Sequence, residues 1–124
     1  MFKHHVLICT QSKPPMVPSC GAVGSAEILD LFRKEIFNAG LENDVMVTGT
    51  GCIGLCTRGA NVVVYPSGKF YTAVKSDEVK KIVEDHLKKG VVVERNDPPE
   101  DNLKMEISMF HQRIKAMMQD AGRL

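Results

Sequence analysis

The order of strand-like and helix-like segments constrains the fold of this chain more than any other feature of the sequence. An apolar run within His4 to Thr10 predicts a short buried strand, and Asp44 to Thr48 predicts a second one. Between them lies a helical pattern that stops at Asn38 to Gly40. Its apolar positions are Ile28, Leu31, Phe32 and Ile36. A strand, a helix and a strand in succession predict that the two strands are parallel.

The segments that follow predict a hairpin and then a helix. Val62 to Tyr65 and Phe70 to Val74 are strand-like and flank the turn sequence PSGK. Ser76 is the expected N-cap of the next helix, whose first turn is acidic and whose end is basic, as the helix dipole favours. Val91 to Val93 is expected to add a small edge strand. The full order predicts an α/β sandwich with a mixed β-sheet flanked by helices.

The last part of the sequence predicts a polar linker, Glu94 to Pro99, and an added C-terminal helix. Asp97 is the expected cap of this helix and Glu100 the reciprocal acid. Its apolar stripe follows steps of four and three residues. The stripe consists of Leu103, Ile107, Phe110, Ile114 and Met117. Such a stripe can pack on its own domain or contact a second chain, so we divide the chain into a domain, 1–93, and a helical extension, 94–124.

Composition and charge narrow the function classes. The 124 residues carry a formal net charge of +1, which argues against a nucleic-acid binder that relies on a basic surface. No apolar run approaches the ~20 residues needed to cross a bilayer, and the N-terminal segment lacks the features of a signal peptide. We therefore expect a cytoplasmic protein without a membrane or nucleic-acid partner. In the cytoplasm, four cysteines are more often metal ligands or redox groups than disulfides.

The cysteines form the candidate site, and they come in two pairs. Ten residues separate Cys9 from Cys20, and three separate Cys52 from Cys56. The first pair brackets the loop after the first predicted strand, and the second pair lies just past the second strand. Because parallel strands of a βαβ unit end at the same edge of the sheet, all four sulfurs can meet there. Four thiolates complete the ligand set of tetrahedral zinc or of a [2Fe–2S] cluster.

Three glycines near the second pair allow another interpretation, because Gly49, Gly51 and Gly54 spell the dinucleotide pattern G-x-G-x-x-G. That pattern requires a helix to start within it, whereas here a β-rich run, NVVVY, follows shortly after Cys56. Glycine also permits the close backbone approach that a metal cluster needs. Zinc, a disulfide and free thiols remain alternatives, although zinc sites favour two short knuckles. The spacing favours the [2Fe–2S] cluster.

The residues around the cysteines also resemble a known family. ICTQ from Ile8, SCGA from Ser19 and TGTGCIGLCTRGANVVVYP from Thr48 closely resemble the thioredoxin-like [2Fe–2S] ferredoxins of the Shethna protein I type. The resemblance covers about residues 3 to 93. It implies a thioredoxin-like fold, a homodimer and a cluster near the surface held by four cysteines. By position these ligands are Cys9, Cys20, Cys52 and Cys56.

The resemblance implies a soluble one-electron carrier that serves other redox proteins and is not an enzyme. The partners it implies are a reductase, an acceptor oxidoreductase or both, with a link to nitrogenase in some members. The C-x3-C half is shared with a subunit of respiratory NADH dehydrogenase and hydrogenases, so a cluster-bearing subunit of such a complex is one alternative. A non-redox structural or interaction module that holds zinc is the other. The extension, 94–124, falls outside the resemblance and is expected to modify the dimer or select a partner.

Overall fold

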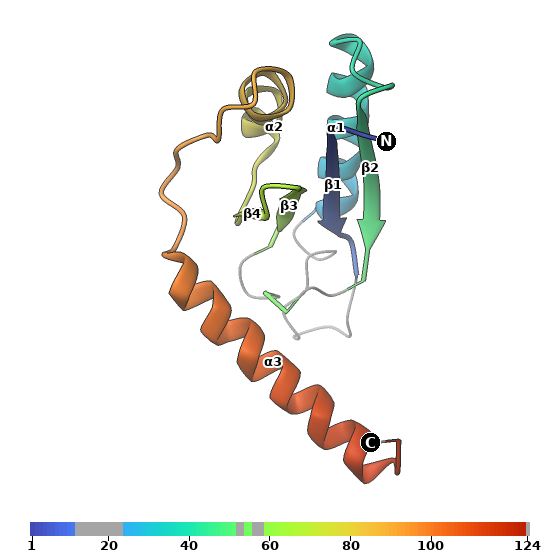
Figure 1. Cartoon of the computed structure of the whole chain (residues 1–124), viewed down its shortest axis with the longest axis vertical. Coiled ribbons are helices and arrows are strands. Elements are labelled where there is room, and N and C mark those ends of the chain that lie inside the picture. The colour runs from blue at the N-terminus through green and yellow to red at the C-terminus, as the bar shows by residue number, and fades with distance from the viewer. Residues whose placement is uncertain (12–23, 52–53, 56–58, 124) are drawn as a thin grey trace.

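Strands and helices follow one another along the chain in the order that the sequence predicts (Figure 1). The structure is a computed structural model that describes residues 1–11, 24–51, 54–55 and 59–123. The elements are β1 (His4–Cys9), α1 (Ser25–Asn38), β2 (Val45–Thr50), β3 (Val62–Tyr65), β4 (Lys69–Tyr71), α2 (Ser76–Ile82), η3 (Val83–Lys88) and α3 (Glu100–Asp120). The second predicted helix is thus α-helical in its first half and π-helical in its second, η3.

The strands of the described chain form one mixed sheet in the order β2-β1-β3-β4. β1 pairs with β2 in parallel, from His4 opposite Val45 to Cys9 opposite Thr50. β3 runs antiparallel to both β1 and β4. The predicted βαβ unit and the predicted hairpin are therefore both confirmed, and β1 lies in the interior of the sheet.

The core forms where alternate side chains of the strands meet the helices. Val6 and Ile8 of β1 are fully buried, whereas His5, whose position alternates to the other face of the sheet, is exposed. The helical spacing predicted for α1 places Phe32 at the centre of its buried face. Apolar side chains of α2 and η3 join the same core cluster, so both helical segments cover the sheet through one continuous apolar layer.

The prediction of an extra strand at Val91 to Val93 is wrong, because this segment takes no part in the sheet. Its backbone donors have other partners. The Val93 N–H donates to the hydroxyl of Tyr71 at 3.1 Å, and the Val91 N–H donates to the carbonyl of Asp85 at 2.9 Å. Since these two donors bond to a side chain and to a helix end, no strand ladder forms here.

The strand predicted to reach Val74 ends earlier, at Tyr71. The Thr72 N–H donates to the Asp97 carboxylate at 3.1 Å instead of to a neighbouring strand. Ala73 then adopts a left-handed conformation with φ of 48°, which no regular strand contains. The chain therefore leaves the sheet just after Tyr71.

Both predicted helix caps also need correction. Lys75 is the N-cap of α2 and Ser76 its first helical residue, while the Glu78 carboxylate accepts a hydrogen bond from the Lys75 N–H at 3.1 Å. At α3 the N-cap position is Pro99, and Asp97 does not cap the helix. Its carboxylate is already engaged by the domain, so it is unavailable to the helix N-terminus.

The helix α3 extends away from the sandwich and passes the edge of the sheet to which the arrowheads of β1 and β2 point (Figure 1). Leu103 is its one buried residue, and its exposed residues include Met105, Met109 and Met117. Among the described helices, none is long and apolar enough to cross a membrane.

Candidate metal centre

The sheet places one predicted ligand, Cys9, next to the start of the loop that carries two others. Cys9 is the last residue of β1 and lies opposite Thr50, the last residue of β2. The Thr10 N–H donates to the Thr50 carbonyl at 3.0 Å, which extends the parallel pairing past the strand ends. Cys52 follows Thr50 by two positions in the sequence. The expectation that the two strands end at one edge is thus confirmed.

Cys9 is a buried thiol at the end of a paired strand. Its side chain belongs to the buried set, with 2% exposed, and within the described residues it forms no disulfide. Its backbone N–H donates to the Asn61 carbonyl at 3.4 Å. The other three predicted ligands lie outside the described residues, so their convergence on Cys9 stays a prediction. They are Cys20, Cys52 and Cys56.

Asn61 ties the far side of the cysteine loop to the ligand strand, and sequence reasoning missed it. Its fully buried side chain donates from Nδ2 to the carbonyl of Leu55 at 2.7 Å, directly before Cys56 in the sequence. Its own carbonyl accepts the bond from Cys9. The sequence feature that could have indicated its role is an amide side chain directly before a run of three valines, which are buried in the structure. A buried amide must bond to something, and here it bonds to the loop.

The glycines of the loop are needed because other elements approach it closely. A Cβ on Gly54 would lie 2.9 Å from a ring carbon of Phe110, and Gly54 has φ of +94°. A Cβ on Gly49 would lie 3.1 Å from the side chain of Leu29 in α1. A side chain at Gly54 would therefore be strained and would displace the Phe110 ring, whereas one at Gly49 would need the Leu29 side chain to shift by a few tenths of an ångström. This explains the glycines without a phosphate, and Gly49 itself lies in β2 rather than at a helix start.

The described residues fit a group held by thiolates. Gly54, Leu55 and Ala60 are all buried, so the described part of the loop is apolar and shielded from water. In the described part of the chain, no three His, Cys, Asp or Glu side chains converge as a metal site. The two histidines before Cys9 have other contacts: His5 bonds to the Thr48 hydroxyl at 2.8 Å, and His4 packs edge-on against His86.

Comparison with known proteins identifies the family, although no family model matches the chain. A 2Fe-2S ferredoxin of Clostridium pasteurianum is 41% identical over 95 residues, which cover 75% of this chain and 93% of the relative. One of Aquifex aeolicus is 44% identical over 97 residues, which cover 76% and 86%. The crystal structure of the wild-type thioredoxin-like [2Fe-2S] ferredoxin from Aquifex aeolicus matches with a TM-score of 0.71 and 41% identity, covering 75% of this chain and 93% of that one.

The chain belongs to the thioredoxin-like [2Fe–2S] ferredoxin family. The thioredoxin-like α/β fold, the [2Fe–2S] cofactor and the class of electron carrier rather than enzyme are thereby confirmed. The zinc-module alternative is not favoured. About a quarter of this ferredoxin lies outside the match to the Clostridium relative.

Proposed function

We propose that this ferredoxin carries single electrons between redox proteins on one [2Fe–2S] cluster. The ligands in this proposal are Cys9, Cys20, Cys52 and Cys56. The observation that carries it is the place of Cys9, a buried thiol outside any described disulfide, at the strand end that lies beside the entry to the C-x3-C loop. The bound cluster supplies a one-electron couple.

Residues of the chain hold the backbone around the proposed ligands in place. The parallel pairing of β1 with β2 fixes Cys9 opposite Thr50, and the side chain of Asn61 fixes Leu55. Partners that orient ligands in this way also tune the metal centre. The buried backbone around Leu55 keeps water away, which penalises the more negative reduced state and lowers the potential.

We further propose the finer assignments that follow from family membership. These are a reductase, an acceptor oxidoreductase or both as partners, a nitrogenase-linked system among the candidates, a cytoplasmic location and a homodimer. Phe37 of α1 and Met46 of β2 support the dimer, because both are exposed and line one surface hollow that a second copy would bury. Sedimentation of wild-type protein and of Met46→Glu tests this, and a wild-type monomer contradicts it.

We also propose that residues 1–93 form the domain that binds the cluster and that residues 94–124 form an extension of it. The matched share of the chain, about three quarters, supports it. Arg95 and Asp97 nevertheless bond to the domain, so the extension begins firmly attached and not as a free linker.

The test is an absorption and electron paramagnetic resonance spectrum of anaerobically purified protein, before and after dithionite, with iron and sulfide assayed on the same sample. We expect a coloured species that bleaches partly on reduction, with iron and sulfide in the ratio of a [2Fe–2S] cluster. Serine replacement of each cysteine in turn should weaken or abolish it. Thr10→Ser, a change beside Cys9 that leaves every thiol in place, is the matched control. A colourless protein that holds zinc and no sulfide after reconstitution overturns the proposal.

A further inference from the structure

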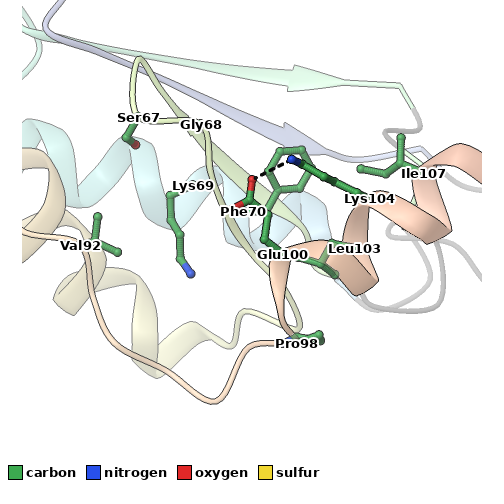
Figure 2. A pocket seen from close by; sticks show the side chains of 10 residues that line it. All are labelled: Ser67, Gly68, Lys69, Phe70, Val92, Pro98, Glu100, Leu103, Lys104 and Ile107. Atoms are coloured by element: carbon green, nitrogen blue, oxygen red, sulfur yellow. Dashed lines mark ion pairs between the residues drawn. The ribbon is translucent and has the colours of Figure 1, made fainter.

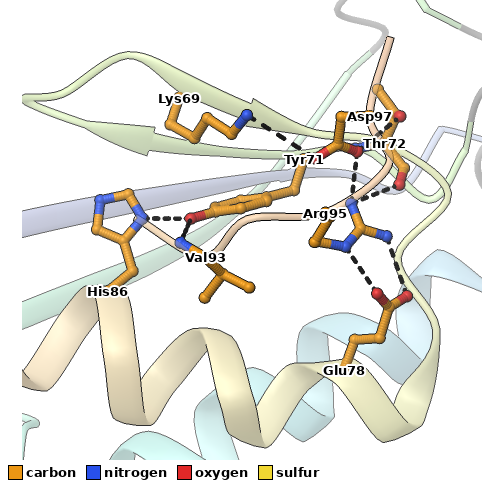
Figure 3. A network of polar contacts seen from close by, with 8 residues as sticks. All are labelled: Lys69, Tyr71, Thr72, Glu78, His86, Val93, Arg95 and Asp97. Atoms are coloured by element: carbon orange, nitrogen blue, oxygen red, sulfur yellow. Dashed lines mark hydrogen bonds and ion pairs between the residues drawn. The ribbon is translucent and has the colours of Figure 1, made fainter. Parts of the chain in front are cut away.

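The extension is clamped to the domain at its root by Arg95 (Figure 3). The side chain of Arg95 is 12% exposed, and its guanidinium grips the Glu78 carboxylate of α2 with two bonds, Nε to Oε2 at 2.7 Å and Nη2 to Oε1 at 3.0 Å. Its Nη1 also donates to the Thr72 carbonyl at 3.0 Å and to Asp97. A two-pronged bond of this kind fixes direction as well as position.

Asp97 adds a second attachment just before α3 begins. Its side chain is 5% exposed, and Oδ1 accepts hydrogen bonds from the Thr72 N–H and the Thr72 hydroxyl, both at 3.1 Å. The Lys69 ammonium lies 3.8 Å from Oδ2. The path by which the chain enters α3 is therefore set by the domain.

The first turns of α3 then lie against the β3–β4 hairpin (Figure 2). Leu103 is buried, and Ile107 is half-buried one turn further on. Together with Phe70 of the hairpin they line a cavity of 370 Å³. The apolar stripe predicted from the sequence thus faces the domain in this half of the helix.

The next residue of the stripe, Phe110, reaches the cysteine loop. Its ring lies so close to Gly54 that a Cβ there would be 2.9 Å from Cδ1 and 3.2 Å from Cγ. Gly54 is buried and is the middle residue between Cys52 and Cys56 in the sequence. Beyond this contact the stripe is exposed, at Ile114 and Met117. The packing of α3 on the domain therefore ends at the loop.

We propose that α3 is a cover for this chain's own cluster-binding loop, and that Phe110 is the positioning residue through which it acts. The inference rests on the proposed function, because it takes Cys52 and Cys56 as ligands. The ring holds the backbone at Gly54 and excludes water from that side of the loop. Since reduction adds negative charge, a drier loop disfavours the reduced cluster and lowers the midpoint potential. A held loop also releases iron more slowly and exchanges its amide hydrogens more slowly.

The test compares three variants in the full-length protein. Phe110→Ala removes the cover, and Phe110→Leu keeps an apolar side chain at the same place. Met109→Ala is the matched control, because Met109 is the neighbouring residue and is 63% exposed. Three quantities are measured: hydrogen exchange of the peptide that contains Gly54 and Leu55, the midpoint potential, and the rate of iron release to a chelator.

We expect Phe110→Ala to raise the potential, to release iron several-fold faster and to exchange the Gly54 peptide faster. Phe110→Leu should lie between it and the wild type, and Met109→Ala should match the wild type. Far-ultraviolet circular dichroism that matches wild type in Phe110→Leu shows that the shift does not arise from misfolding. Equal exchange rates, potentials and iron release in Phe110→Ala and Met109→Ala overturn the cover.

The exchange measurement separates this inference from the proposed function. It needs no cluster and is made on the protein as purified. Faster exchange at Gly54 in Phe110→Ala, in a protein that assembles no cluster, supports the cover and rejects the electron carrier. A protein that assembles the cluster but shows no change in exchange on removal of the ring supports the electron carrier and rejects the cover.

Discussion

Two of the places where the extension of this ferredoxin meets the domain differ in their chemistry. At its root, Arg95 and Asp97 make many directional bonds to α2 and to the end of β4. Further along, Phe110 lies as an aromatic ring against the backbone of Gly54. Directional bonds between charged groups can fix the path of the chain. The contact of an aromatic ring with a glycine requires only that the residue under the ring has no side chain. The root determines where α3 goes, and the ring determines what it covers.

Removing the guanidinium at the root should have the largest effect on stability. In Arg95→Ala the carboxylates of Glu78 and Asp97 lose their shared cation, and Asp97 is almost fully buried. Breaking such a pair from one side costs about 3 kcal/mol of unfolding free energy. Urea denaturation of variants in the same cluster state measures it. Arg95→Lys keeps the charge without the two-pronged geometry and should recover only part of the loss.

Lys104→Ala is the control for the root. Lys104 pairs with Glu100 at 3.7 Å on the exposed side of α3, and both side chains are largely in solvent. Its removal should change the unfolding free energy by no more than about 0.5 kcal/mol. A loss in Arg95→Ala as small as that in Lys104→Ala would show that the root bonds do not hold the extension.

Placing a methyl group under the ring should have the next largest effect. Gly54→Ala must accept φ of +94° and a contact at 2.9 Å, and together these should cost about 2 kcal/mol. In the Phe110→Ala background only the backbone penalty remains, so the double-mutant cycle should show a coupling of about 1 kcal/mol. Denaturation of the four proteins measures this coupling.

Gly90→Ala isolates the backbone penalty. Gly90 has φ of +76°, and nothing lies within 4 Å of the position that a Cβ would take. Its substitution should cost about 1 kcal/mol in both backgrounds, because Phe110 is not involved. A zero coupling energy between positions 54 and 110 would mean that the ring does not rest on the loop in solution.

The features that the sequence predicted correctly are those fixed by neighbours along the chain. The apolar run of β1 and the helical spacing of α1 each depend on residues within one element, and both elements are found where they were expected. The shared end of β1 and β2 joins distant residues, but it follows from the general rule that strands of a βαβ unit are parallel, and it placed Cys9 correctly. The stripe of α3 predicted that one face packs, and the face is confirmed up to Phe110.

The features that the sequence missed depend on partners far along the chain. β4 ends at Tyr71 because Thr72 bonds to Asp97, twenty-five positions later. The expected strand at Val91 to Val93 fails because Tyr71 takes its donor, across a separation of 22. No local pattern encodes such pairings. An acidic residue just before a helix can either cap that helix or accept hydrogen bonds from a distant element, and the sequence does not distinguish the two. The contact of Phe110 with Gly54 belongs to the same class.

Acid should weaken the root and leave the ring contact intact. Tyr71 links the root to His86. The Arg95 guanidinium carbon lies 5.9 Å from the centre of the Tyr71 ring, and the Tyr71 hydroxyl, which accepts the Val93 N–H, lies 2.7 Å from His86 Nδ1. Burial, and then the charges of His4 and Lys69, lower the pKa of His86 below its ordinary value of 6.5. The hydrogen bonds from Arg95 likewise hold the pKa of Glu78 below 4.5.

Both shifts give the unfolded chain more bound protons than the folded one, so stability falls as the pH falls. The His86 contribution is complete above about pH 6.5 and is lost as the pH drops from there through the lowered pKa of the folded protein. The Glu78 contribution is lost in a more acidic window, below 4.5. Denaturation at pH 8 and pH 5.5 measures the first loss, and His86→Gln should make that profile flatter. The coupling between positions 54 and 110 should be equal at both pH values, because neither partner titrates. A coupling that falls with pH alongside stability would show that the cover depends on the root and is not an independent contact.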